Sequence, residues 1–204
     1  MTVPAATIVL ASASPRRRQL LEMLGIPVEV CPSHVPEERA PGEPPRAYAE
    51  RLAREKAASV PGRLVLGADT TVVVDGEVLE KPRDAADALR MLRLLQGRRH
   101  EVITAVALRA AGELLEATDV TAVTFRPAGD AFLRAYVATG EPLDKAGAYG
   151  IQGYGAALVE RIEGDFFGVM GLPVRLVLDL LARAGYRYGF GAGGGSGGEA
   201  AASA

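Results

Sequence analysis

The sequence predicts an α/β fold, a mixed twisted sheet flanked by helices, with two lobes around a cleft. Apolar runs suited to buried strands alternate with stretches of helical spacing over most of the 204 residues, which is typical of layered α/β proteins. Two longer strand-like runs, 100–110 and 113–126, flank a tight Ala111-Gly112 turn. Such a hairpin favours a mixed sheet over a purely parallel one. A chain of this length suits a single domain, which we expect over residues 1–188.

The first elements follow from the local pattern. Thr7 to Ala11 is an apolar run that predicts a buried strand, and residues 17–24 have helical spacing. Ser14 suits the N-cap of that helix and Pro15 its first position. The following patterns predict, in order, a strand at 28–31, a helix at 46–60, a strand at 64–68 that ends in Asp69-Thr70, and a hairpin of 71–74 and 77–79.

The remainder of the chain continues the alternation until the last residues. The patterns predict helices at 84–95, 130–139 and 172–184 and a strand at 156–162. Residues 189–204 consist mainly of glycine, alanine and serine. Such a segment buries too little apolar surface to offset its ordering entropy. We therefore expect a disordered tail there.

Composition restricts the partners and the compartment. A net charge of −2 gives no support for a broad grip on nucleic acid or an anionic membrane. No apolar stretch approaches the length of a membrane span, and the N-terminus does not resemble a signal peptide. The single cysteine, Cys31, excludes an internal disulfide and fits a reducing compartment. We expect a cytoplasmic protein and assign no role to Cys31, His34 or His100.

A glycine-rich segment at 144–153 is the most informative stretch of the chain. Glycines allow close backbone approach to a ligand. Lys145 suits a phosphate, while Gln152 and Tyr149 suit reading or stacking on a base. The segment therefore predicts a nucleotide-contacting loop, with a structural turn as the alternative.

The stretch Ser12-Ala-Ser-Pro-Arg-Arg-Arg18 predicts an anion site. A helix N-terminus carries unpaired amide hydrogens and a partial positive charge. Three arginines in the first turn are unfavourable there unless an anion lies among them. A solvated basic face is the alternative interpretation.

Asp69 follows an apolar strand, so a rigid element would hold it as a general base or a metal ligand; a turn or a helix cap is the alternative. Lys81 follows the short hairpin and Lys56 lies on the second predicted helix, where ordinary exposed lysines are equally compatible. Glu37 and Glu38 form an acidic pair in a loop, which suits Mg²⁺ or Mn²⁺ or simply solubility.

Together these residues suit hydrolysis of a phosphoanhydride. Cations and a metal neutralise developing charge while an aspartate activates water. The chain contains no G-x-G-x-x-G after the first strand and no G-x-S-x-G. Hydride transfer and serine hydrolysis are therefore disfavoured.

Five motifs in order resemble the Maf family, nucleoside triphosphate pyrophosphatases once described as septum formation proteins. The motifs are Leu10-Ala-Ser-Ala-Ser-Pro-Arg-Arg17, Gly67-Ala-Asp-Thr70, Glu80-Lys-Pro82, Asp144-Lys-Ala-Gly-Ala-Tyr-Gly-Ile-Gln-Gly153 and Val169-Met-Gly-Leu-Pro173. The resemblance implies an inosine triphosphatase-like fold and a homodimer. It also implies cleavage of a nucleoside triphosphate to the monophosphate and pyrophosphate with a divalent metal, Mg²⁺ or Mn²⁺.

Roles for individual residues follow from the resemblance. Asp69 is expected to be the proton acceptor, and Glu37 with Asp69 to bind the metal. The residues expected to hold phosphates are Ser12, Arg16, Lys56, Lys81 and Lys145. Those expected to set substrate specificity are Arg16, Thr70 and Gln152.

The Ile-Gln ending of the loop resembles the subfamily that prefers dTTP and UTP. An amide both donates and accepts, which matches the edge of these pyrimidines. The sequence departs from the family at Pro36, where an acidic residue is common, and at 164–168, where Gly-Asp-Phe-Phe-Gly replaces a Tyr-Tyr-Ser pattern. The other function that we consider is a nucleotide-binding regulator of cell division without essential catalysis.

Overall fold

A computed structural model describes residues 7–190 and contains one mixed sheet of seven strands. The spatial order is β2-β1-β3-β5-β6-β7, and β4 pairs with β3 beside this path. Only β2, β1 and the start of β3 run parallel, and the other pairs are antiparallel. The strands are β1 (Ile8–Leu10), β2 (Val28–Val30), β3 (Leu64–Val74), β4 (Glu77–Leu79), β5 (Arg99–Ala110), β6 (Glu113–Phe125) and β7 (Val159–Glu163).

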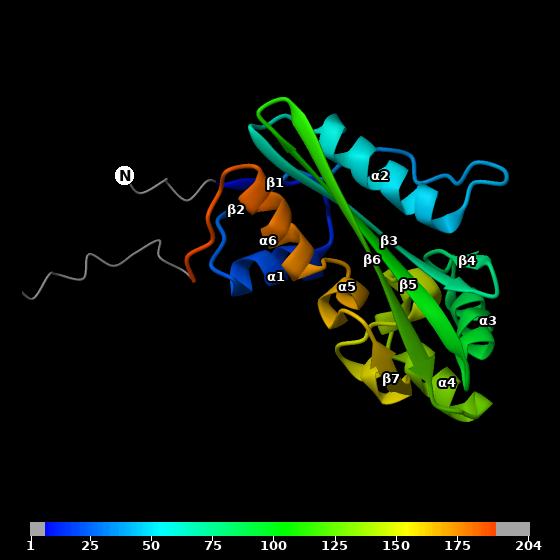
Figure 1. The fold of residues 1–204 in the computed structure, drawn as a ribbon. Helices are drawn as coiled ribbons and strands as arrows, with labels where there is room; N and C mark the ends of the chain where they lie inside the picture. The colour runs from blue at the N-terminus through cyan, green and yellow to red at the C-terminus, as the bar shows by residue number, and fades with distance from the viewer. Residues whose placement is uncertain (1–6, 191–204) are drawn as a thin grey trace, which may run out of the picture.

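The helices cover the sheet on both sides. The helix α2 lies along β3 and β5, while α6 packs on β5 and β6, so the two helices take opposite faces (Figure 1). The helices are α1 (Pro15–Met23), α2 (Pro45–Ser59), α3 (Ala85–Leu95), α4 (Asp130–Ala138), α5 (Phe166–Met170) and α6 (Val174–Arg183), with short 3-10 turns at Glu141–Asp144, Ala146–Ala148 and Tyr154–Leu158. The predicted mixed α/β sheet flanked by helices is confirmed.

The hairpin of β5 and β6 forms the long spine of the sheet (Figure 1). Its ladder runs from Arg99 opposite Thr124 to Ala110 opposite Glu113. Ala111 and Gly112, which join the strands, have φ values of 49° and 86°. Two consecutive positive φ values match the right-handed twist of the paired strands, so the turn supports the twist of the sheet.

The two largest hydrophobic clusters of the described residues mark two lobes. One core gathers α3, α4 and the ends of β5 and β6 around Leu92, Phe125 and Leu133. The other gathers α1, β1 and α6 around Leu10 and Leu66. Figure 1 shows α1 and α6 on one side of the long strands and α3 and α4 at the other end. This separation leaves the middle of β3 between the lobes.

Several predicted boundaries are wrong, with physical reasons. The strand expected to end before Asp69 continues as β3 through Val74, because it pairs with β5 from Leu64 to Val73. Asp69 therefore lies in the middle of a strand. The strand expected from 156 begins at Val159, since a 3-10 turn precedes it.

Two further differences concern helices. The short helix α5 was not predicted, because Phe-Phe-Gly-Val-Met carries little helical periodicity, and α6 begins at Val174 instead of 172. Ser14 and Pro15 occupy the predicted cap and first position of α1, but the Ser14 side chain makes no capping bond. Its backbone N–H instead donates to Ser12 Oγ at 3.2 Å.

Two predictions about extent stay predictions. A single domain over 1–188 is compatible with the continuous sheet, and the tail expected at 189–204 falls mostly on 191–204, outside the described residues. Within residues 7–190, none of the helices has the length and apolar character needed to cross a membrane.

Candidate functional site

A cavity of about 460 Å³ lies between the lobes. Its walls come from the end of β1 and the start of α1, the middle of β3, the helix α2 and the glycine-rich loop. Every residue predicted for the site lines this cavity: Ser12, Arg16, Glu37, Lys56, Asp69, Thr70, Lys81, Lys145 and Gln152. Segments more than 100 residues apart in sequence therefore meet at one place, as the site hypothesis requires.

The geometry of the sheet places Asp69 on the cavity wall. β1 ends at Leu10, which pairs with Leu66, and the chain then turns away at Ser12. β3 continues beyond that point, so its next residues have no β1 neighbour. Asp69 is only 7% exposed, and a rigid strand fixes its carboxylate at the edge of the cavity.

Lys56 joins two carboxylates on the cavity wall. Its Nζ donates to Asp69 Oδ1 at 2.7 Å and to Glu37 Oε1 at 2.5 Å. Lys81 Nζ donates to the other oxygen of Glu37 at 3.2 Å. Burial acts to raise the pKa of Glu37, but the bonds from both lysines outweigh it and hold that pKa below its ordinary value. Glu37 is therefore ionised at neutral pH.

This pair of carboxylates fits a divalent cation shared with a ligand. Glu37 and Asp69 both reach the same Nζ atom, so their oxygens converge on one small region. Among the described residues, no group of three His, Cys, Asp or Glu side chains forms a self-sufficient metal cage. Mg²⁺ commonly takes one or two carboxylates and completes its shell with phosphate oxygens and water. The donor set suits that mode of binding.

Arg17 is a buried cation of the site that the sequence analysis did not assign. Its Nε donates to Gly171 O at 2.7 Å, one Nη to Ser12 Oγ at 3.0 Å and the other to Thr70 Oγ1 at 3.0 Å. Thr70 is also within 3.0 Å of Thr104 Oγ1. Arg17 thus ties the start of α1, the middle of β3 and the end of α5 together, and it fixes the Thr70 hydroxyl.

Burial lowers the pKa of the Arg17 guanidinium, while the charges of Asp69 and Glu37 oppose that shift. A signal for this burial was present in the sequence. Arg17, Leu20, Leu21 and Leu24 fall on one helical stripe, so the arginine belongs to the buried face of α1.

Two cations from distant segments lie close together where the glycine-rich loop lines the cavity. Arg16 Nη1 lies 3.3 Å from Asp144 Oδ2, and Lys145 Nζ lies 2.5 Å from Asp144 Oδ1. The Lys145 ammonium also donates to Glu141 O at 2.6 Å. Asp144 thereby holds one cation of α1 beside one cation of the loop. Both were predicted to hold phosphates, and their convergence fits a multiply charged anion.

Tyr149, predicted to read or stack on a base, lines the cavity, and this role stays a prediction. Its side chain is buried, and its hydroxyl lies 2.9 Å from His100 Nε2. Its ring makes edge contacts with His100 and Phe125, at centroid distances of 5.4 and 4.7 Å. Tyr149 anchors the loop in the core. Gln152 is exposed and also lines the cavity, and its role in reading a base likewise stays a prediction.

His100 gives the fold an acid sensitivity. Burial lowers its pKa to about 4, against about 6.5 in an unfolded chain. The stability that depends on a neutral His100 is therefore fully present above about pH 6.5, and it is lost as the pH falls from there toward 4. We expect His100→Gln to reduce the loss of unfolding free energy between pH 7 and pH 5 by about 2 kcal/mol, measured by denaturant titration. His34→Gln, at an exposed position, is the matched control; equal pH profiles for wild type and His100→Gln would contradict this account.

The fold and the cavity define an α/β protein with a cleft lined by several cations and two carboxylates. The chain belongs to the Maf family, since the family model described as Maf-like protein matches residues 7–184. It is 57% identical over 186 residues to the dTTP/UTP pyrophosphatase of Anaeromyxobacter dehalogenans strain 2CP-1, covering 89% of this chain and 96% of that protein.

Other relatives carry the same name. The chain is 52% identical to the dTTP/UTP pyrophosphatase of Chromobacterium violaceum, with 88% and 95% of the two chains covered. It is 50% identical to that of Escherichia coli O6:K15:H31, with 86% and 92% covered. Among solved structures, the Ham1 protein of Staphylococcus aureus matches with a TM-score of 0.44 and 16% identity over 76% of this chain and 80% of that one. That likeness is too weak to add to the fold assignment.

Proposed function

We propose that this protein hydrolyses dTTP and UTP to the nucleoside monophosphate and pyrophosphate. The observation that carries the proposal is the buried Asp69 carboxylate, bonded to Lys56 and facing the cavity that Arg16 and Lys145 also line. A base and a set of cations in one cavity suit attack of water on a phosphoanhydride. Relatives at 50–57% identity bear the name dTTP/UTP pyrophosphatase, which supports the same substrates.

In the proposed mechanism, Asp69 accepts the proton of a water molecule that attacks the α-phosphorus. A new bond forms between the water oxygen and that phosphorus, and the bond to the bridging oxygen breaks. The bonding electrons leave with pyrophosphate, whose charge Arg16, Lys81 and Lys145 stabilise. Lys56 orients Asp69 through the 2.7 Å bond. Glu37 and Asp69 would hold a divalent cation, Mg²⁺ or Mn²⁺, which supplies charge neutralisation when bound.

Specificity is proposed to come from the exposed amide of Gln152 together with Arg16 and Thr70, which line the same cavity. We also propose that the protein acts in the cytoplasm as a homodimer. The resemblance to the family supports both points, and light scattering after size exclusion measures the oligomeric state.

The test of the function is a panel of nucleoside triphosphates with Mg²⁺ or Mn²⁺ and with products resolved by chromatography. We expect dTTP and UTP to yield the monophosphate and pyrophosphate. Release of single phosphate with a nucleoside diphosphate would contradict the assigned bond cleavage. Binding of UTP without any turnover would favour a non-catalytic regulator instead.

Arg17→Lys provides a test of the wall that holds Thr70. A lysine ammonium cannot reproduce three donations to Gly171, Ser12 and Thr70, so we expect kcat/KM for UTP to fall about tenfold or more. Arg18→Lys is the matched control, because that exposed arginine pairs only with Glu22 on the same helix in the described part of the chain. If Arg17→Lys and Arg18→Lys had the same kcat/KM for UTP, Arg17 would have no role in the site.

A further inference from the structure

The carboxylate of Glu141 accepts hydrogen bonds from two consecutive backbone amides, those of Tyr154 and Gly155. Its Oε1 accepts from Gly155 N at 3.0 Å, and its Oε2 accepts from Tyr154 N at 2.9 Å. Oε1 also accepts from the Tyr136 hydroxyl at 2.9 Å. Although burial acts to raise the pKa of Glu141, these bonds outweigh it and hold that pKa below its ordinary value. The acceptor is therefore an ion, which makes such bonds strong.

Tyr136 extends this cluster to the other end of the loop. Its buried hydroxyl donates to Glu141 and accepts from Gly150 N at 3.2 Å. Gly155 thus binds the carboxylate directly, and Gly150 is connected to it through Tyr136. Their backbones also touch directly, since a Cβ on Gly155 would lie 2.3 Å from Gly150 O. The segment between them is a closed loop held at both ends.

Gln152 lies inside this closed loop. The next residue, Gly153, has a φ of 88°, and a Cβ there would lie 2.6 Å from Glu141 Oε2. Only glycine permits the carboxylate to approach the backbone so closely at this φ. The backbone that carries the exposed amide of Gln152 is therefore fixed one residue away by Glu141.

The same residue also touches the phosphate side of the cavity. The backbone oxygen of Glu141 accepts from Lys145 Nζ at 2.6 Å. The stem of Lys145 crosses Gly150, where a Cβ would lie 2.8 Å from Lys145 Cε. Glu141 thus bonds to both parts of the cavity: its side chain to the backbone beside Gln152, and its backbone oxygen to the Lys145 ammonium.

We propose that Glu141 and Tyr136 are positioning residues for base recognition. They hold the 150–155 loop so that the Gln152 amide faces the substrate base in one orientation. This inference rests on the proposed function, because it presumes that a nucleotide base lies against Gln152. It predicts a loss of discrimination between bases without a matching loss of phosphate chemistry.

The test compares Glu141→Gln with wild type on three substrates: UTP, CTP and deoxyribose 5′-triphosphate, which has no base. We expect the ratio of kcat/KM for UTP to that for CTP to fall about tenfold, mainly through KM for UTP. Hydrolysis of the triphosphate without a base should change less than about twofold, because it does not use Gln152. Tyr136→Phe should give the same pattern more weakly, and it serves alone if Glu141→Gln does not fold.

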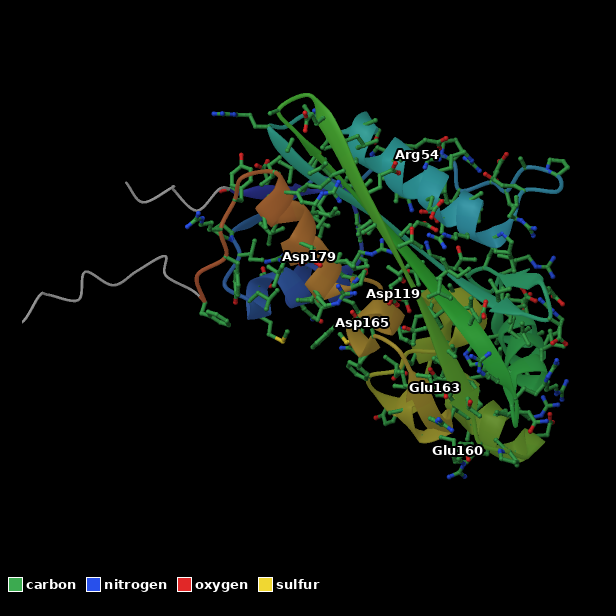
Figure 2. All side chains as sticks on the ribbon, in the orientation of Figure 1. Arg54, Asp119, Glu160, Glu163, Asp165 and Asp179 are labelled. Carbon is green, nitrogen blue, oxygen red and sulfur yellow. The ribbon has the colours of Figure 1, made fainter. Side chains whose placement is uncertain are left out.

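Glu160→Gln is the matched control. Glu160 is an exposed residue of β7, labelled in Figure 2, and forms no ion pair within the described residues. The inference would be overturned if Glu141→Gln and Tyr136→Phe both left the UTP-to-CTP ratio of kcat/KM unchanged. Equal losses of kcat/KM on all three substrates would also overturn it. A wild-type protein that does not prefer UTP would instead contradict the proposed function, so the two failures are distinguishable.

Discussion

Asp69→Asn is expected to lower kcat for UTP hydrolysis by about three orders of magnitude. A positioned general base contributes about 10² to 10⁴ in rate, and an amide cannot accept the proton of the attacking water. Asparagine has the same shape and can still accept the bond from Lys56 Nζ, now 2.7 Å from Asp69 Oδ1. The fold and the binding of a non-hydrolysable UTP analogue should therefore persist, which separates loss of chemistry from loss of structure.

Steady-state kinetics, thermal unfolding and analogue binding make up the measurement. Asp75→Asn is a control in the same strand region, because Asp75 is an exposed residue of the β3–β4 turn and pairs with Arg98. Its kcat should equal that of wild type. A kcat of Asp69→Asn within tenfold of wild type would show that Asp69 is not the general base, and Glu37 would be the next carboxylate to test.

The motifs that resemble the family predicted the residues that line the cavity, whereas residue types alone left a turn or cap open for Asp69 and an exposed position open for Lys56. In the structure both side chains are buried, which conflicts with their charge unless they are paired. The structure resolves the conflict by pairing Lys56 with Asp69. Strand and helix patterns were equally informative, since hydrophobic periodicity reflects burial directly.

The burial of Arg17 is indicated by the helical stripe of α1, but the backbone partners of Arg17 and Glu141 are not indicated by any pattern in the sequence. Arg17 binds a backbone oxygen of Gly171, 154 positions away, and Glu141 binds backbone amides 13 and 14 positions away. Neither partner is a side chain of complementary charge, so residue types give no hint of the pairing. The end of β3 was misplaced for a similar reason, because only its pairing with β5 keeps Asp69 within a strand.

Small residues let α2 approach β3 closely enough for Lys56 to reach Asp69. The cluster at this interface contains Ala49, Ala53 and Ala57 on α2 and Ala105 and Ala107 on β5, with the larger Val73 and Ile103 toward one end. Gly67 faces the same helix two residues before Asp69, on the same side of the strand. A longer side chain at this interface would increase the distance between helix and sheet, so a short helix-to-strand distance is a condition of the lysine–carboxylate pair.

Gly67→Ala is therefore expected to have the largest effect on stability. Its Cβ would lie 2.3 Å from Ala53 O and 2.6 Å from Ala57 N, and these backbone atoms of α2 cannot rotate away. We expect a loss of about 3 kcal/mol or more in unfolding free energy, measured by denaturant titration. Any folded fraction should hydrolyse UTP at least about tenfold more slowly, because a displaced α2 would move Lys56 away from Asp69.

Gly129→Ala is the control, since a Cβ there meets no atom within 4 Å. This variant should lose no more than about 1 kcal/mol of unfolding free energy. A stable and fully active Gly67→Ala variant would show that the close packing of α2 on β3 does not hold the site together.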